Sequence, residues 1–143
     1  MGRINKGRVI LGGLLAGLII NVGEFVANEL VFGAQAEAMM DRFGLTPPGG
    51  AVLGIFIVVG FIMGIALIWM YAAVRPRLGA GPKTAVIAGL VFWLFGYFLP
   101  FLGDHLMGVW PMSTMITGSL WGLVEICIAA LAGGWVYRET ESA

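Results

Sequence analysis

Two carboxylates, Glu24 and Glu125, are the residues of this sequence whose setting is most unusual for an ionisable group. Each lies inside a long apolar segment, away from the charged residues that separate these segments. A charge placed inside a membrane costs at least ~2.5 kcal/mol on insertion scales, and such residues usually face a bundle interior or an aqueous cavity. Both glutamates are therefore candidates for binding a proton or a ligand.

Asn21 and Asn28 lie about one helical turn on either side of Glu24 and could hydrogen-bond to either carboxylate. No basic residue lies deep enough to pair with the glutamates, and desolvation disfavours the charged form of a carboxylate. We therefore expect at least one of the two to be protonated at neutral pH. If they approach each other, they share a proton and titrate as a coupled pair.

A structural role for these polar residues is the alternative interpretation. A protonated glutamate and two asparagines can fasten helices together through hydrogen bonds worth about 0.6 kcal/mol each on average in membrane proteins. Two buried carboxylates are more than packing requires, so the structural and the functional interpretation both stay open.

The elements that must position these residues are predicted to be transmembrane helices. Of the 143 residues, 59% are apolar and 11% are charged, whereas a soluble domain carries about 25% charged residues. Four apolar segments are long enough to cross a bilayer: residues 9–32, 51–74, 84–102 and 113–137. The sequence predicts an all-α, single-domain integral membrane protein built as a four-transmembrane-helix bundle over residues 1–143. Its net charge of zero and the lack of a long basic run argue against nucleic-acid binding.

The basic residues predict the orientation of the bundle. Of the eight lysines and arginines, only Arg42 falls on the outer side of the predicted helices. The other seven fall on the opposite side: Arg3, Lys6, Arg8, Arg75, Arg77, Lys83 and Arg138. Basic residues in short loops stay in the cytoplasm, so the multi-pass chain is predicted in the plasma or inner membrane with both termini cytoplasmic. A cleavable signal peptide ending near Ala36 is the alternative for the first segment, but apolar residues continue too far towards that site.

Small residues share the helix faces of the two glutamates. Gly13 and Gly17 precede Asn21 and Glu24 at steps of three or four residues, and Gly118 and Gly122 lead to Glu125 in the same way. Such small-xxx-small faces let membrane helices approach closely. We expect these four glycines to pack helices together and both glutamates to point into the bundle.

Asp104 and His105 are further candidates, in the predicted outer connection at residues 103–112. They could bind a metal, admit protons or contact a quinone, although a loop histidine is more often simply solvated. One histidine beside one aspartate provides too few ligands, so no metal site is predicted. The aromatic third segment offers a weak possibility of a quinone or pigment pocket, and no cofactor is predicted. Its aromatic residues are Phe92, Trp93, Phe95, Tyr97, Phe98 and Phe101.

Three classes of function remain, and enzymatic activity is not favoured because no familiar catalytic motif is present. The first, which we expect, is a non-enzymatic packing or accessory protein that forms homo-oligomers or joins a larger membrane complex. The second is a small proton-coupled transporter or channel that uses Glu24 and Glu125. The third is a subunit that binds a lipophilic cofactor.

Four short helices with a glutamate in the first resemble the architecture of the small multidrug transporters. That resemblance implies a proton-carrying role for Glu24. In this sequence, however, Glu24 lies late in its helix and the charge bias is strong, which departs from the pattern of that family.

Overall fold

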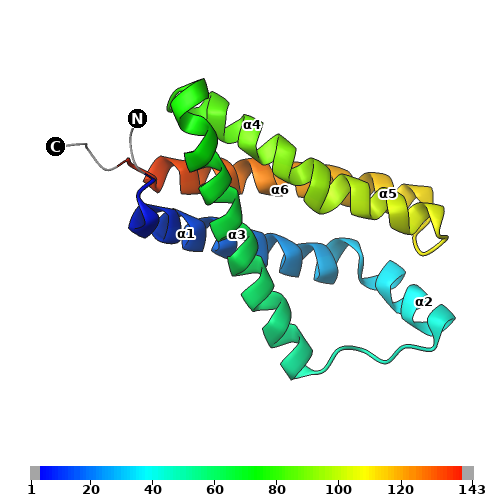
Figure 1. The fold of residues 1–143 in the computed structure, drawn as a ribbon. Helices are drawn as coiled ribbons and strands as arrows, with labels where there is room; N and C mark the ends of the chain where they lie inside the picture. Colours follow the sequence, from blue (N-terminus) through cyan, green and yellow to red (C-terminus); the bar gives the residue numbers. More distant parts are fainter. Residues whose placement is uncertain (1–3, 140–143) are drawn as a thin grey trace.

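The computed structural model describes residues 4–139, which form helices and no strand (Figure 1). Two of the segments, η1 and η2, are single widened turns of π-helix, in which each backbone N–H binds the carbonyl five residues earlier. In chain order the elements are α1 Lys6–Val26, η1 Ala27–Val31, α2 Gly33–Phe43, α3 Gly50–Leu78, α4 Pro82–Trp93, η2 Leu94–Phe98, α5 Leu99–Leu106 and α6 Met112–Val136.

Four continuous helical stretches are long and apolar enough to cross a membrane, as the sequence predicts. They are Lys6–Val31, Gly50–Leu78, Pro82–Leu106 and Met112–Val136. A helix satisfies its own backbone hydrogen bonds, which makes it one of the few structures that can exist in lipid. The predicted all-helical fold with four such helices is confirmed.

Two helices continue beyond the apolar segments that the sequence predicts. The second segment does not end near residue 74 but continues through Pro76 to Leu78, because a proline in the last turn removes only one backbone hydrogen bond. The third continues past residue 102 to Leu106, so Asp104 and His105 belong to helix α5 and not to a loop. Pro100 does not end this helix because the widened turn η2 directly precedes it.

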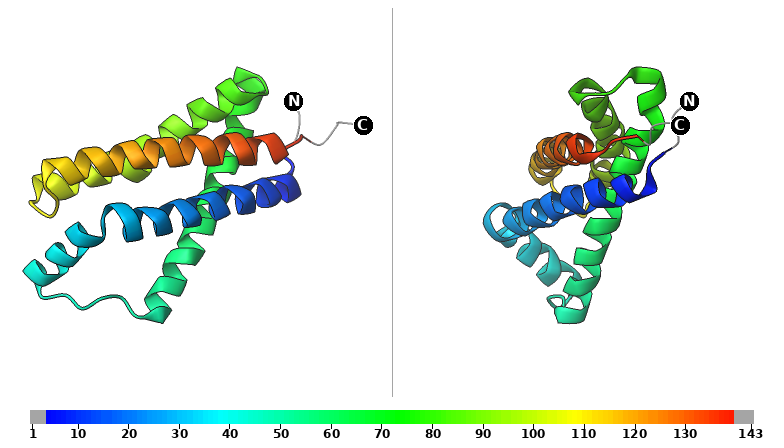
Figure 2. Two further views of the ribbon diagram at one scale, coloured as in Figure 1. Left: turned by 180° about the vertical axis from the view of Figure 1, so that it is seen from behind. Right: turned by 90° about the vertical axis from the view of Figure 1, so that its left-hand side faces the viewer.

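Helix α3 crosses the other long helices steeply, whereas α1, α6 and the α4–α5 stretch run roughly alongside one another (Figures 1 and 2). Helix α1 packs against α3 and α6, and α4 packs against α3 and α6. Because α3 crosses at an angle, only its second half takes part in the core. All residues from Gly50 to Val59 are exposed, and the first buried residue of α3 is Gly60.

The two ends of the described chain lie together, beside the turn between α3 and α4 (Figure 1). Tyr137 organises this end. The Asn5 N–H donates to its hydroxyl at 3.3 Å, the Tyr71 ring meets its ring edge-on, and the Arg75 guanidinium lies over it. Arg75 also forms an ion pair with Glu139 at 3.3 Å. Arg3, which the charge pattern includes, lies outside the described residues.

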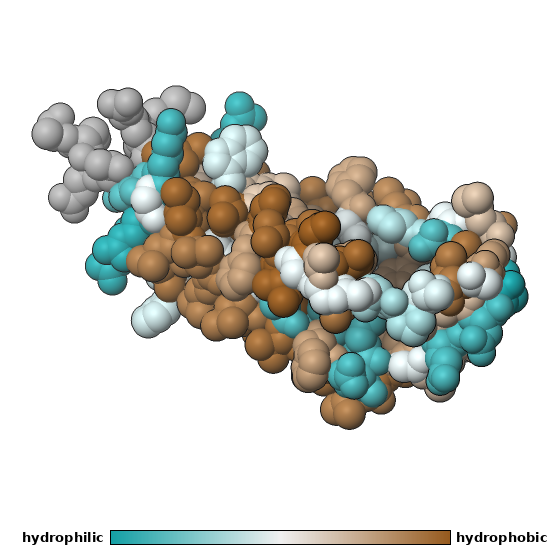
Figure 3. Space-filling view, turned by 90° about the horizontal axis from the view of Figure 1, so that it is seen from below, coloured by the Kyte–Doolittle hydropathy of each residue, from teal (hydrophilic) through white to brown (hydrophobic). Residues whose placement is uncertain are grey.

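The opposite end carries the short helix α2, which Gly44 ends in the left-handed conformation (φ 64°). The Arg42 guanidinium on α2 donates to the Gly108 carbonyl in the turn between α5 and α6, which ties α2 to that turn. On the face shown in Figure 3, hydrophilic residues lie towards the two ends and along the lower edge, and much of the surface between the ends is apolar.

Candidate functional site

Glu24 and Glu125 come together at the hydroxyl group of Tyr97. The phenol oxygen lies 3.0 Å from one oxygen of Glu24 and 2.8 Å from one oxygen of Glu125. Glu125 is buried, with 5% of its surface exposed, and Glu24 is partly buried. The two carboxylates come from α1 and α6, and the tyrosine comes from η2, so three of the four long apolar helices meet at this polar cluster. We call these four helices spans, and the one that contains η2, Pro82–Leu106, is the third span.

Two glycines make room for the cluster. The Tyr97 ring lies on Gly122 of α6, where an added Cβ would be 2.6 Å from a ring carbon. The Glu125 carboxyl group lies on Gly23 of α1, where an added Cβ would be 2.7 Å from the carboxyl carbon. Both separations are shorter than any ordinary van der Waals contact, so any larger residue would push the cluster apart.

Trp121 completes the surroundings of Glu125. Its indole N–H donates to the second carboxyl oxygen at 3.3 Å, from one turn earlier on the same helix. Glu125 therefore has a hydrogen-bond partner for each oxygen, one from its own helix and one from another span.

Widened helical turns occur at both sides of the cluster. Tyr97 lies inside η2, and Glu24 lies three residues before η1. In η2, the turn precedes Pro100, which has no N–H to donate and whose ring would crowd the Gly96 carbonyl in a regular α-helix. In η1, the Asn28 side chain donates to the Glu24 carbonyl at 2.8 Å and so competes for a regular backbone acceptor. Such turns are rare in proteins overall, and many of those that occur lie at functional sites.

The asparagines do not bind the carboxyl groups. Asn21 lies over Gly60 of α3 and donates to the carbonyls of Gly17 and Ile57, at 2.9 and 3.1 Å. Asn28 is exposed and bonds only to the backbone of Glu24 among the described residues. The suggested bonds from these amides to the glutamates are therefore wrong. Each amide instead donates to a backbone carbonyl one turn earlier in the chain.

The four predicted packing glycines lie at contacts between helices. Gly13 and Gly17 of α1 face α3, where added Cβ atoms would be 2.5 Å from Ile65 Cα and 2.7 Å from Phe61 Cα. Gly118 lies under the Phe101 ring and Gly122 under the Tyr97 ring, so these two glycines of α6 receive aromatic rings from the third span.

Asp104 and His105 serve local structure at the end of α5. The His105 Nδ1–H donates to the Trp110 carbonyl at 2.9 Å, and the backbone carbonyl of Asp104 accepts from the Val109 N–H at 2.8 Å. Both bonds close the turn that leads to α6. Among residues 4–139, no three His, Cys, Asp or Glu side chains cluster closely enough to hold a metal.

Two pockets lie away from the cluster, and neither glutamate lines them. One, of about 310 Å³, lies between α3 and the third span and is lined by Met70, Val91, Phe92, Phe95 and Gly96. The predicted aromatic pocket therefore involves only two of the six aromatic residues. Tyr97 and Phe101 face α6 instead, and the Trp93 indole N–H donates to the Ser119 carbonyl at 2.7 Å.

The cluster can hold a shared proton. Two hydrogen bonds at one phenol oxygen need two protons, and the phenol provides only one. A carboxyl group can provide the second, so the geometry of the Glu24–Tyr97–Glu125 chain can accommodate a proton on a carboxyl group. A proton that moved along this chain would pass from the partly exposed Glu24 to the buried Glu125.

Sequence reasoning missed Tyr97, Trp121 and Gly23 as members of the site. One signal was available for Tyr97, because it is the only tyrosine in the third span and a buried phenol usually finds a hydrogen-bond partner. No comparable signal marks Gly23, since its role depends on which helix faces it. Comparison with protein-family models, with curated proteins and with solved structures finds no match for this chain.

Proposed function

We propose that the chain is a small integral membrane protein with both termini in the cytoplasm. The four long apolar helices support insertion, and the positions of the basic residues support the orientation. Lys6, Arg75, Lys83 and Arg138 belong to the end of the molecule where the termini lie, whereas Arg42 belongs to the opposite end. In this orientation the lipid bilayer covers the many apolar side chains that the isolated chain exposes.

Within the membrane, the protein acts as a non-enzymatic packing or accessory subunit that assembles with further copies of itself. The observation that carries this proposal is the closed polar cluster: both glutamates end on one tyrosine hydroxyl, and Glu125 has both oxygens hydrogen-bonded within the chain. A cluster in which each carboxyl group is hydrogen-bonded within the chain fastens three spans together.

The first half of α3 is the surface that we assign to self-assembly. All residues from Gly50 to Val59 are exposed, and a Cβ added at Gly50 or Gly54 would meet nothing. At the other glycines of the same helix the space is occupied: Asn21 packs on Gly60, and the backbone of α1 packs on Gly64. A second α3 could use the open Gly50–Gly54 face in the way that α1 uses Gly60 and Gly64.

A specific observation also favours proton-coupled transport as a second candidate function. The Glu24–Tyr97–Glu125 chain runs from a partly exposed carboxyl group to a buried one. One widened helical turn follows Glu24, and the other contains Tyr97. Carboxyl groups with this arrangement in a membrane are typical of proton relays.

One double variant separates the two candidates. Glutamine keeps the hydrogen-bonding capacity of the glutamates but cannot exchange a proton, so Glu24→Gln with Glu125→Gln should leave the packing role intact. We expect this variant to keep the oligomeric mass of the wild type, measured in detergent, and to show the same response in pH-gradient flux assays with liposomes. A flux that is present in the wild type and absent in the variant would instead establish the proton-coupled function.

The assembly surface is tested in the same preparation. Gly54→Leu should lower the oligomeric mass, because the larger side chain blocks close approach of a second α3. Leu120→Ala is the control, since Leu120 is exposed on α6, away from this surface. A wild type that is monomeric in both detergent and bilayers would contradict self-assembly.

A further inference from the structure

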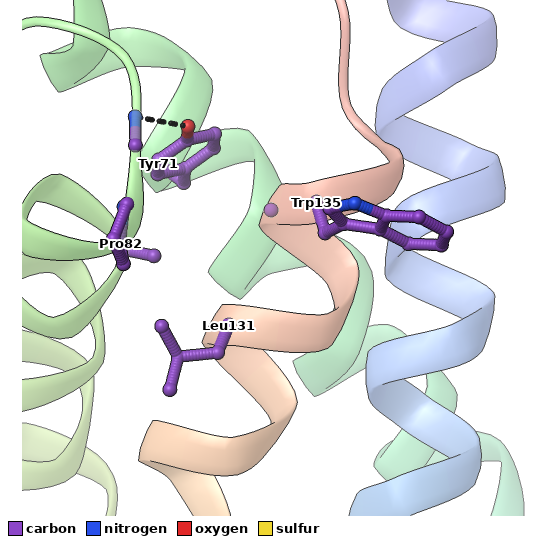
Figure 4. A pocket seen from close by; sticks show the side chains of 7 residues that line it. Tyr71, Pro82, Leu131 and Trp135 are labelled. Carbon is purple, nitrogen blue, oxygen red and sulfur yellow. Dashed lines mark hydrogen bonds between the residues drawn. The ribbon is translucent and has the colours of Figure 1, made fainter.

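The second pocket lies at the end of the molecule that carries the termini, between the start of α4 and the end of α6 (Figure 4). It has a volume of about 280 Å³ and is lined by Tyr71, Gly81, Pro82, Ala85, Leu131, Gly134 and Trp135. Tyr71, Pro82 and Leu131 surround it, whereas the Trp135 ring turns away from it at its edge.

Three helices border this pocket, and its lining is mostly apolar. The one hydroxyl in it, on Tyr71, already accepts a hydrogen bond from the Gly81 N–H at 3.2 Å. The pocket is therefore shaped mainly for hydrocarbon, and its polar side-chain groups are the Tyr71 hydroxyl and the Trp135 indole N–H.

Its depth matches the beginning of a lipid tail. Pro82 is the first residue of α4, and Leu131 lies five residues before the end of α6 at Val136. At 1.5 Å per residue, the pocket spans roughly the last 8 Å of the helices. Exposed Trp135 lies at the same level, where an amphipathic ring prefers the membrane interface.

Basic residues stand close in the sequence to the residues that line the pocket. Lys83 is the next residue after Pro82, which lines the pocket. Arg77 comes shortly before the Gly79–Gly81 turn, and Arg138 comes three residues after Trp135. All three basic side chains are exposed. Glu139 is the only acidic residue at this end in the described part of the chain, and it is paired with Arg75. Basic pockets between helices on the cytoplasmic side recognise anionic lipid headgroups.

We propose that the pocket between α4 and α6 holds an acyl chain of an anionic phospholipid, whose headgroup phosphate lies against Lys83. Bulk lipid is as apolar as the pocket, so the shape of the pocket determines where the chain lies and the basic residues select the headgroup. The inference rests on the proposed insertion with this end at the cytoplasmic leaflet, and it holds whether the polar cluster carries protons or not.

The test is native mass spectrometry of the full-length protein, purified in detergent and supplied with phosphatidylglycerol and phosphatidylcholine of the same acyl chains. We expect phosphatidylglycerol to be retained in preference. Lys83→Gln should weaken this preference about fivefold, the effect of one cation near an anionic lipid. Lys6→Gln is the matched control, because Lys6 is an exposed lysine at the same end that does not adjoin the pocket.

A second pair of variants tests the pocket itself. Leu131→Trp should fill it and lower the retention of both lipids, whereas Leu120→Trp, at an exposed position of α6 outside the lining, should not. Equal retention of the two lipids, or equal effects of Lys83→Gln and Lys6→Gln, would overturn the proposal in favour of ordinary lipid contact. A change of oligomeric mass in Leu131→Trp, with lipid retention unchanged, would overturn it in favour of a second copy.

Failure of this inference is distinguishable from failure of the proposed function. If only the lipid site is wrong, the protein still inserts into liposomes and keeps its oligomeric mass. If membrane insertion is wrong, the protein does not float with vesicles of either lipid in a density gradient.

Discussion

At the residue scale, one hydroxyl group joins two carboxyl groups that are 101 positions apart in the sequence. Tyr97 is the central member of the cluster, because both Glu24 and Glu125 bind its oxygen and neither asparagine substitutes for it. Hydrogen bonds between polar side chains in a membrane are individually modest, but a carboxyl group left without a partner in the bundle pays a desolvation cost.

Tyr97→Phe removes the hydroxyl and keeps the ring on Gly122. We expect a loss of about 1–3 kcal/mol in the free energy of unfolding, the cost of leaving buried polar partners unsatisfied, measured by denaturant titration in detergent micelles. Tyr137→Phe is the control, because its hydroxyl accepts a single long bond near the chain end. Equal losses in the two variants would mean that the cluster contributes nothing beyond an ordinary hydrogen bond.

At the element scale, glycine faces determine where helices touch. The stripe of Gly13, Gly17, Asn21 and Glu24 lies on one side of α1, but α3 covers only its first three members because it crosses α1 at an angle. Beyond the crossing, the same stripe faces the third span and meets Tyr97. One helix face therefore serves two partners, packing in its first half and holding the polar cluster in its second.

A packed glycine of α3 and an open glycine of α5 test this division. A Cβ at Gly64 would lie 2.6 Å from Gly17 Cα, so Gly64→Ala must separate α1 from α3, and we expect a loss of about 1–3 kcal/mol in the free energy of unfolding. Gly103→Ala on α5, outside the proposed assembly surface, meets open space and should be neutral or stabilise the helix by up to ~1 kcal/mol. Thermal unfolding followed by circular dichroism measures both, and similar midpoints would contradict the α1–α3 contact.

At the scale of the whole molecule, charge separates the two ends. The proposed orientation places residues 44–49 outside the cell and the turn between α3 and α4 inside it. Both regions are exposed, and the apolar surface between them would be covered by lipid (Figure 3).

This orientation is tested with single cysteines in a Cys127→Ser background, since Cys127 is the only cysteine of the chain. Leu45→Cys should react with a membrane-impermeant maleimide in intact cells. Leu78→Cys, which is similarly exposed, should react only after the cells are opened. The reverse pattern would place the termini outside and would also move the basic lipid pocket to the outer leaflet.

The sequence alone determined the helical content and the four long apolar helices, because length and hydrophobicity are local properties of a segment. It also singled out Glu24 and Glu125, since a carboxyl group inside an apolar run is visible without knowing any neighbour. Helix ends were less predictable: Pro76 and Pro100 are local signals for stopping, yet both lie within helices that continue.

Only the tertiary structure decided what the glutamates contact. The spacing of Glu24 assigns it to a helix face. Because α3 crosses α1 at an angle, α3 covers that face only before Glu24, and Tyr97 contacts Glu24 instead. The roles of Gly23 and Trp121 likewise depend on the position of the Glu125 side chain. Its carboxyl group packs on Gly23 of α1, and one of its oxygens accepts a hydrogen bond from Trp121 of its own helix. The physical reason is that a helix face follows from residue spacing, whereas its partner depends on how side chains of all four helices pack around one another.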